Sequence, residues 1–473
     1  MEDETDCETD FICFKDASWN ILKTSVPSIL GLIFEMLIEV VNLMFIGHLD
    51  DPVALAGVGL GNMMLTMICF SIGVGLNGAI DTLVSQAYGD KEYYLCGCYL
   101  NRGRIIQALF FVPQLIILTF SSEILILLGQ DESSAEAAQQ YITILLPGMF
   151  AMAQFETFRR YLQAIGNFEL ATYTQCSSMI LHFIMSYILI FVCDLGVKGS
   201  AISTSITYWI NLIVVILYLS YREGVIPSAA FHTFNIDSLK NWRQFLVFGV
   251  PSILMLCLEW WSFEVLAIFA GWFSVEDLAA NIILCNFLGF LFNFSLGMSY
   301  VVGNLVGNSL GEMKPNQAKK YFYTSIVIIT QIAAIALIFI NLYRDQIPLI
   351  YTQQSQVVEC IENVFPVFTI TIFFDLFQGV ESGSLRAIGY QGHGFVICLI
   401  GYWLITIPCA YIFSIPLGLK LTGIWLGVPI GSFITCVLYG YILLKTDWRQ
   451  IAQETERRIR SEKTELEVPL TKL

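Results

Sequence analysis

The sequence predicts an all-α integral membrane protein with twelve transmembrane helices in two pseudo-symmetric lobes of six helices each. Three observations lead to this fold class. Hydrophobic residues make up 56% of the 473 residues, charged residues only 13%, and the mean hydropathy is +0.68, which is far from the balance of a soluble globular domain. Apolar windows of about 20 residues, long enough to cross a bilayer, recur along the chain. The two halves of the chain also repeat one another.

The repeat is seen most directly in the segment VPSIL, which begins at Val26 and again at Val250. Each copy is followed five residues after its end by a carboxylate, Glu35 in the first half and Glu259 in the second. A repeat of about 220 residues in the same direction has the length expected of six membrane helices with short loops. The other matches are LVSQAYGDK from Leu83 with LVGNSLGEMK from Leu305, YLQAIGN from Tyr161 with SLRAIGY from Ser384, and Gly196 and Gly199 with Gly418 and Gly423.

The apolar windows place six spans in each half. The fourth window has the least secure boundaries, because Arg159 and Arg160 interrupt its apolar sequence near the end. In the first half the expected spans are 26–47, 54–79, 104–128, 141–163, 170–193 and 197–221. In the second half they are 245–271, 278–303, 322–342, 359–381, 394–416 and 421–444.

These spans divide the chain into five parts, and the positive charges give its orientation. With both termini in the cytoplasm, 21 of the 24 Lys and Arg residues fall in cytoplasmic segments or at the cytoplasmic ends of spans. We expect a multi-pass protein of the plasma membrane, with the membrane of an acidic organelle as the alternative. The parts are an acidic cytoplasmic segment 1–25, an N-lobe 26–221, a cytoplasmic linker 222–244, a C-lobe 245–445 and a cytoplasmic tail 446–473.

Several function classes are disfavoured by the sequence. The net charge is −15 and the expected topology leaves no basic stripe, so nucleic-acid binding has no support. A membrane-embedded enzyme would need a nucleophile with a base or a metal motif such as HExxH, and neither occurs. The thirteen cysteines are scattered without metal or disulfide spacing. We therefore expect no enzyme activity, no metal and no cofactor.

Acidic residues inside the spans carry the expected chemistry. An ionisable side chain at mid-bilayer costs roughly 2.5 to 3.5 kcal/mol on insertion scales, so each one is a functional hypothesis. We expect no Lys or Arg at comparable depth to neutralise them, and unpaired carboxylates in a low dielectric hold protons until a cation or water arrives. This pattern is typical of a proton-coupled cation carrier. The acids are Glu35, Glu39, Asp81, Glu156, Glu259, Glu264, Asp375 and Glu381.

Neighbouring polar and aromatic residues complete the candidate site. Glu35 and Glu39 are four residues apart and share a helical face, with Asn42 as a nearby amide. Glu259 is favoured as the deeper group of its helix, because it is the repeat partner of Glu35. Trp260, Trp261 and Tyr300 could hold a flat cation by face contact, and Asn281 could line a cavity. Each of these residues also has a structural alternative. Each acid could be a structural carboxylate, the aromatic residues could pack against lipid, and Asn281 could form a hydrogen bond between helices.

Five motifs resemble the multidrug and toxic compound extrusion (MATE) family in its eukaryotic form. They are GHLDDPVALAGVGLGN from Gly47, DTLVSQAYG from Asp81, RRYLQAIG from Arg159, PSILMLCLEWWSFE from Pro251 and VVGNLVGNSLGE from Val301. The resemblance, which covers roughly residues 20 to 445, implies a twelve-helix antiporter that exports organic, often cationic, compounds in exchange for protons. It also implies that Glu259, Glu264 and Asp375 belong to a C-lobe site. Bacterial relatives often carry Asp where this chain has Asn42, so an amino-lobe proton site would depend on Glu35, Glu39 or Asp81.

The expected function is therefore secondary active export by alternating access, with protons as the coupling ion. Sodium coupling and a lipid-linked oligosaccharide flippase of related two-lobe build are the alternatives. The flippase is disfavoured because such proteins usually need cationic pockets for pyrophosphate, and we expect almost no Lys or Arg at mid-membrane depth. We expect a small organic cation as substrate, contact with membrane lipids and function as a monomer. The final residues Thr471 to Leu473 also resemble a weak carboxy-terminal PDZ ligand.

Overall fold

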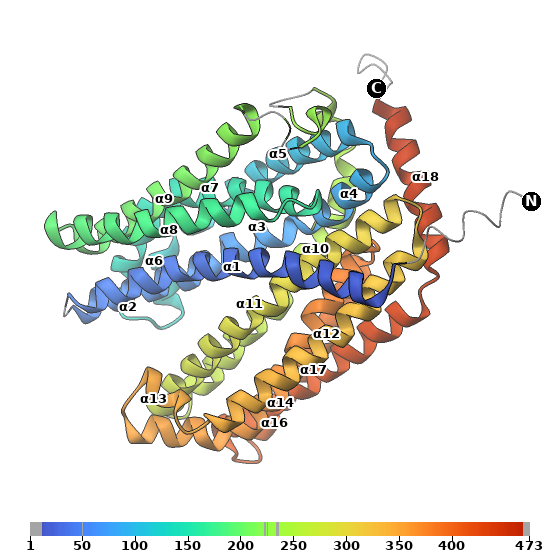
Figure 1. The fold of residues 1–473 in the computed structure, drawn as a ribbon. Coiled ribbons are helices and arrows are strands. Elements are labelled where there is room, and N and C mark those ends of the chain that lie inside the picture. Colours follow the sequence, from blue (N-terminus) through green and yellow to red (C-terminus); the bar gives the residue numbers. More distant parts are fainter. Residues whose placement is uncertain (1–11, 50, 222–223, 225, 233–235, 467–473) are drawn as a thin grey trace, which may run out of the picture. The chain divides into compact units, whose positions relative to one another are not determined.

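The computed structural model describes residues 12–49, 51–221, 224, 226–232 and 236–466, and every regular element within these ranges is a helix (Figure 1). The expected PDZ-like ending lies outside the described residues. Ten helical segments are long and apolar enough to cross a membrane, with consecutive helical elements such as those of Pro52–Gly89 counted as one. The bent pair of α5 (Tyr93–Leu118) and α6 (Ser121–Leu127), with an angle of 56°, forms an eleventh. The 33-residue α7 (Glu132–Ala164) is also long enough to cross, although it is more polar. The described chain thus has twelve helices of membrane length, and the predicted fold class is confirmed.

The helices follow the order of the expected spans, with a short helix or a π-helical turn added at several points. The first half contains α1 (Phe14–Gly47), α2 (Pro52–Leu65), η1 (Thr66–Phe70), α3 (Ser71–Leu76), α4 (Gly78–Gly89), α5 (Tyr93–Leu118), α6 (Ser121–Leu127), α7 (Glu132–Ala164), α8 (Glu169–Tyr187), η2 (Ile188–Val192) and α9 (Gly196–Tyr221). The linker contains η3 (Ser228–Ala230) and η4 (Ile236–Leu239). The second half contains α10 (Trp242–Gly271), α11 (Val275–Gly311), α12 (Pro315–Leu342), α13 (Ile347–Tyr351), α14 (Ser355–Ala387), α15 (Gln391–Cys398), η5 (Leu399–Thr406), α16 (Ile407–Ser414), α17 (Lys420–Lys445) and α18 (Trp448–Leu466).

Local capping explains where several of these helices begin. The Asp51 carboxylate accepts hydrogen bonds of 3.0 and 3.1 Å from the backbone N–H groups of Val53 and Ala54, so α2 starts directly after it. Asp131 caps α7 in the same way. At the start of α11, Ser274 accepts from the backbone N–H of Asp277 at 3.0 Å and donates to its carboxylate at 2.9 Å. These short polar residues stop one apolar helix and start the next.

The described chain forms two compact units. One, here called the amino-terminal unit, contains residues 30–253 and 459–466; in it α7 packs on α2 and α9, and α8 packs on α9. Figure 1 shows α7, α8 and α9 side by side. The carboxy-terminal unit contains residues 12–29 and 254–458, and α14 packs there between α11 and α17. The lobe boundaries expected from the sequence, 26–221 and 245–445, stay a prediction.

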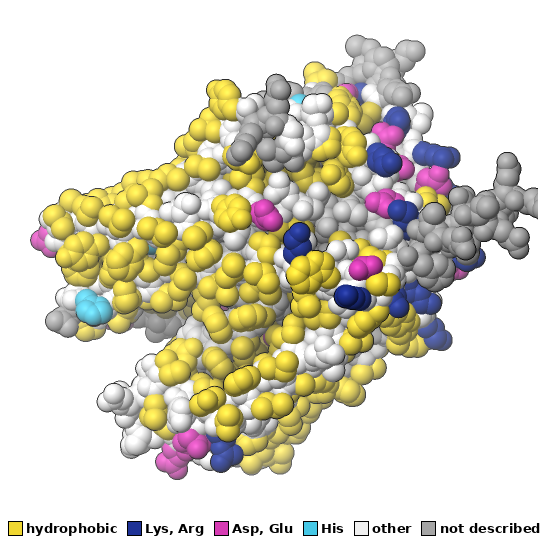
Figure 2. Space-filling view, in the orientation of Figure 1, with side chains coloured by type: hydrophobic (Ala, Val, Ile, Leu, Met, Phe, Trp, Pro, Cys, Tyr) yellow, Lys and Arg dark blue, Asp and Glu magenta, His cyan; other side chains and the backbone are white. Residues whose placement is uncertain are grey.

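The outer faces of the helices are apolar, as a lipid environment requires. On the segment formed by α8 and η2, the exposed side chains include Ile180, Phe183, Ile184 and Val192. Figure 2 shows hydrophobic side chains over most of the visible surface of α8 and α9. An apolar surface of this extent would be unfavourable in water and is stable against hydrocarbon.

The amino-terminal unit also holds the linker and the end of α18 through charged contacts. Lys240 pairs with Asp237 at 2.8 Å, and the hydroxyl of Tyr94 donates to the same carboxylate at 2.7 Å. These two hydrogen bonds hold the pKa of Asp237 below its ordinary value. Arg102 pairs with Glu462 of α18 at 2.6 Å, and both side chains are buried. The last turns of α18 are therefore anchored to α5.

Two glycines at equivalent positions of the repeat allow helix backbones to touch. A Cβ atom at Gly199 of α9 would lie 2.7 Å from the carbonyl oxygen of Leu189, and one at Gly423 of α17 would lie 2.5 Å from the carbonyl carbon of Phe413. Because backbone atoms cannot rotate away, we expect either glycine-to-alanine substitution to lower the stability by about 1 to 3 kcal/mol. Thermal unfolding in nanodiscs measures this loss.

The matched control is Gly59→Ala in α2, where a Cβ would meet nothing within 4 Å. This substitution should leave the unfolding temperature unchanged or raise it slightly, because alanine is the better helix former. Equal unfolding temperatures for all three variants would show that the close backbone contacts do not matter.

Candidate functional site

Three buried carboxylates lie on two helices of the carboxy-terminal unit, Glu259 on α10 and Asp375 and Glu381 on α14. Each is at most 9% exposed. Glu259 accepts a hydrogen bond of 2.9 Å from Nε2 of Gln378 and one of 3.4 Å from the hydroxyl of Tyr402. Asp375 precedes Gln378 by three residues and shares its face of α14. α10, α14 and η5 thus meet at the carboxylate of Glu259.

These three acids have no ion-pair partner within the described ranges. No ion pair of the described chain includes Glu259, Asp375 or Glu381. One carboxylate oxygen of Glu381, Oε2, is buried without a hydrogen-bond partner. A buried carboxylate without a counter-charge is costly, so such a group is stable when it carries a proton or when a cation binds beside it. The arrangement suits reversible proton or cation binding.

Three acids of the amino-terminal unit, in contrast, form ion pairs with buried arginines. Arg159 of α7 pairs with Glu35 at 2.8 Å and with Glu156 at 2.7 Å, and Arg160 pairs with Asp81 at 2.6 Å. Both arginine side chains are 2% exposed. The expectation that no Lys or Arg lies at the depth of the acids is therefore wrong for this unit. The reason is that the two arginines do not end the span in water but lie on a buried stretch of α7, which continues to Ala164.

The repeat allows the acids of the two halves to be compared at equivalent positions. Glu35 and Glu259 are equivalent at an offset of 224, and the motif that contains Arg159 aligns at an offset of 223, which places Ser382 opposite Arg159 and Gly383 opposite Arg160. The same carboxylate therefore has an arginine ion-pair partner in one half of the chain and none in the described part of the other. Among the described acids of the expected spans, arginine ion pairs occur in the amino-terminal unit alone.

Four other predicted residues are more exposed than the three buried carboxylates of the carboxy-terminal unit. Glu39 is exposed on α1, and Glu264, Trp260 and Trp261 are partly buried on α10. Neither Glu39 nor Glu264 takes part in an ion pair of the described chain. Their roles in binding stay predictions.

The predicted amides bond to neighbouring helices. Asn42 of α1 donates a hydrogen bond of 2.8 Å to the hydroxyl of Thr204 on α9. Asn281 of α11 accepts one of 3.0 Å from the indole N–H of Trp425 on α17. These contacts favour the alternative that such amides hold helices together. Tyr300, also on α11, is 4% exposed, and its part in binding stays a prediction.

Sequence reasoning missed the two side chains that donate hydrogen bonds to Glu259, those of Gln378 and Tyr402. Polar uncharged side chains are common in membrane helices, so neither position stands out by composition. Their recognition requires the packing of η5 and α14 against α10. The pairing of Arg159 could have been suspected from the repeat, because the arginine has no counterpart in the second half.

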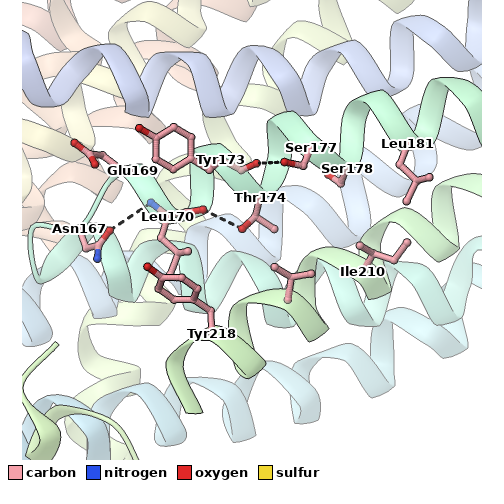
Figure 3. A pocket seen from close by; sticks show the side chains of 11 residues that line it. Asn167, Glu169, Leu170, Tyr173, Thr174, Ser177, Ser178, Leu181, Ile210 and Tyr218 are labelled. Atoms are coloured by element: carbon pink, nitrogen blue, oxygen red, sulfur yellow. Dashed lines mark hydrogen bonds between the residues drawn. The ribbon is translucent and has the colours of Figure 1, made fainter. Parts of the chain in front are cut away.

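A groove of the amino-terminal unit lies elsewhere, between α8 and α9. It has a volume of about 530 Å³, with Glu169, Tyr173 and Tyr218 toward one end and Leu181 and Ile210 toward the other (Figure 3). Among the described residues that line this groove, Glu169 is the only carboxylate. The groove therefore does not contain the candidate acids.

Comparison with known proteins agrees with the repeat. The family model described as MatE matches the chain twice, at residues 27–188 and 251–412. Protein DETOXIFICATION 14 of Arabidopsis thaliana is 29% identical over 432 residues, which cover 90% of this chain and 88% of that protein. Multidrug and toxin extrusion protein 1 of Xenopus tropicalis is 29% identical, and the match covers 94% of this chain and 77% of that protein.

Solved structures resemble the fold over nearly its whole length. The crystal structure of the eukaryotic MATE transporter AtDTX14 matches with a TM-score of 0.90 and 26% identity, covering 94% of this chain and 99% of that one. A mutant of the Vibrio cholerae MATE transporter VcmN matches with a TM-score of 0.83 at 19% identity, covering 92% of this chain and 99% of that one, and supports the fold alone. With both halves matched by the family model, the chain belongs to the MatE family and is a multi-pass membrane transporter of the eukaryotic MATE type.

Proposed function

We propose that this transporter is a secondary active antiporter that exports organic cations in exchange for protons by alternating access. The observation that carries the proposal is that Glu259, Asp375 and Glu381 are buried and have no ion-pair partner in the described chain. A membrane protein retains such acids at a cost, and proton or cation binding is the chemistry that they perform.

Proton and substrate compete for the same negative charge in this proposal. A proton that arrives from one side neutralises Glu259 and releases the cation, and loss of the proton on the other side restores the cation site. If one proton exchanges for one monovalent cation, the cycle moves no net charge. The pH difference then drives it, at about 1.4 kcal/mol or tenfold accumulation per pH unit.

Aromatic side chains near the acids suit a cationic substrate. Tyr402 lies against Glu259, and its ring centroid is 6.3 Å from that of Phe263. Phe373 and Phe374 directly precede Asp375 on α14, and their ring centroids lie 5.3 Å apart. Aromatic faces attract desolvated cations by about 0.5 to 2 kcal/mol each. Relatives named for multidrug and toxin extrusion and for detoxification support a broad range of organic substrates.

Location and partners are part of the same proposal. We place the transporter in the plasma membrane, with an acidic organelle membrane as the alternative, and its termini in the cytoplasm. It functions as a monomer with no cofactor besides the coupling ion. Sodium as that ion is the alternative that the experiment below separates.

The test is uptake of a fluorescent organic cation into proteoliposomes. With a pH gradient of one unit and the membrane potential clamped to zero, we expect accumulation of about tenfold over protein-free vesicles. A sodium gradient at equal pH should drive no accumulation. Sodium-driven uptake without pH-driven uptake would identify sodium as the coupling ion and contradict the proton proposal, and transbilayer movement of a labelled pyrophosphate lipid without cation uptake would favour the flippase.

A further inference from the structure

The side-chain amide of Gln378 forms hydrogen bonds through its nitrogen and none through its oxygen. Its side chain is 2% exposed, and Nε2 donates both to the carboxylate of Glu259, at 2.9 Å, and to the hydroxyl oxygen of Tyr402. The other end, Oε1, is buried without a hydrogen-bond partner. A primary amide offers two donors on nitrogen and an acceptor on oxygen, so the acceptor end is idle in this arrangement.

This arrangement matches the charged form of Glu259. A carboxylate can only accept hydrogen bonds, and here it accepts from Gln378 and from Tyr402. When Glu259 gains a proton, its new O–H group is a donor that faces another donor. A half-turn of the amide would bring Oε1 to accept from this group and so satisfy the unpaired acceptor, while Nε2 would give up its hydrogen bonds to Glu259 and Tyr402.

We propose that Gln378 is a positioning residue that responds to the protonation state of Glu259, with Nε2 donating to the carboxylate and, after a half-turn of the amide, Oε1 accepting from the carboxylic acid. This inference rests on the proposed function. The O–H bond of Glu259 is the only bond that forms or breaks, and its proton enters from the solution on one side of the membrane and leaves on the other. Tyr402 keeps its hydroxyl proton in both states.

Neighbouring residues of η5 contact both the backbone and the side chain at Glu259. The indole N–H of Trp403 donates a hydrogen bond of 2.9 Å to the backbone carbonyl of Leu258, directly before Glu259. Tyr402 and Trp403, which are adjacent on η5, thus contact the carboxylate of Glu259 and the backbone of α10. π-Helical turns such as η5 are frequent at functional sites. The other titratable or charged groups that interact electrostatically with Glu259 are Asp375 and Arg386 on α14, Cys398 on α15, Tyr402 on η5 and Tyr439 on α17.

The test compares Gln378→Met with the native protein in pH-driven cation uptake. Methionine keeps the length of the side chain and removes both ends of the amide, so the charged form of Glu259 loses a donor and the protonated form loses an acceptor. The loss of the donor dominates, because hydrogen bonds to charged groups are the stronger ones. We expect the pH of half-maximal uptake to rise by about one unit. Tyr402→Phe should shift it in the same direction by less. Gln114→Met is the matched control, because Gln114 is a buried amide on α5 of the other unit, and it should leave the pH profile unchanged.

Infrared difference spectra of glutamine-labelled protein provide a second readout that does not depend on the uptake assay. Titration across the transport pH should shift one buried amide carbonyl band together with the appearance of a protonated carboxyl band, and Gln378→Asn should alter this amide band. A carboxyl band that appears with no change in any amide band would overturn the switch.

Glu259→Gln separates the two claims. If this variant still transports with the native pH profile, the proposed function is wrong. If it loses pH-driven transport while Gln378→Met keeps the native pH profile, the proposed function stands and the switch at Gln378 does not exist.

Discussion

Replacement of Arg159 by methionine is expected to destabilise the protein by about 3 to 5 kcal/mol, the usual result of removing one member of a buried ion pair. Arg159 pairs with both Glu35 and Glu156, and its side chain is 2% exposed. The substitution leaves two carboxylates in a low-dielectric interior without their counter-charge. Thermal unfolding in nanodiscs at neutral pH measures the loss.

Two further variants show whether charge is the cause. The triple substitution of Arg159→Met with Glu35→Gln and Glu156→Gln removes the uncompensated charges and should recover most of the stability. Lys314→Met breaks a pair whose side chains are 38% and 40% exposed, and should cost no more than about 1 kcal/mol. If Arg159→Met unfolds at the native temperature, the arginine does not stabilise the two acids.

The fold could be predicted from the sequence because its signals are long. The repeat anchored by Glu35 and Glu259 extends over about 220 residues, and apolar windows of membrane length are set by the thickness of the bilayer. The family model confirms the duplication, since its two matches are also 224 residues apart. Details that depend on single residues, such as the π-helical turn η5, have no comparable signal in the sequence.

The candidate site could be predicted only in part. Buried acids such as Asp375 are visible in a sequence because charge inside an apolar span is rare. Whether an acid has a partner depends instead on which helices pack together. Arg159 lies 124 residues from Glu35, and only the packing of α7 against α1 brings the two within 2.8 Å. The hydrogen bonds of Gln378 and Tyr402 to Glu259 depend on tertiary packing in the same way.

The repeat-related acids should therefore differ in function. Glu259→Gln removes a carboxylate that has no ion-pair partner in the described chain, so no exchangeable proton remains at this position. We expect the rate of pH-driven cation uptake to fall by about a hundredfold, or about 2.7 kcal/mol. Glu35→Gln removes one of the two carboxylates that share Arg159, and the arginine keeps Glu156 as its partner. This variant should transport within about twofold of the native rate.

The comparison of Glu259→Gln with Glu35→Gln is the most direct measurement of the central claim, that exchange takes place at the acids without ion-pair partners. Both variants carry the same chemical change at equivalent positions of the repeat, and both should be reconstituted at equal density and assayed under the same pH gradient. The account predicts that only Glu259→Gln loses uptake. Loss in Glu35→Gln with native uptake in Glu259→Gln, or equal loss in both, would contradict it.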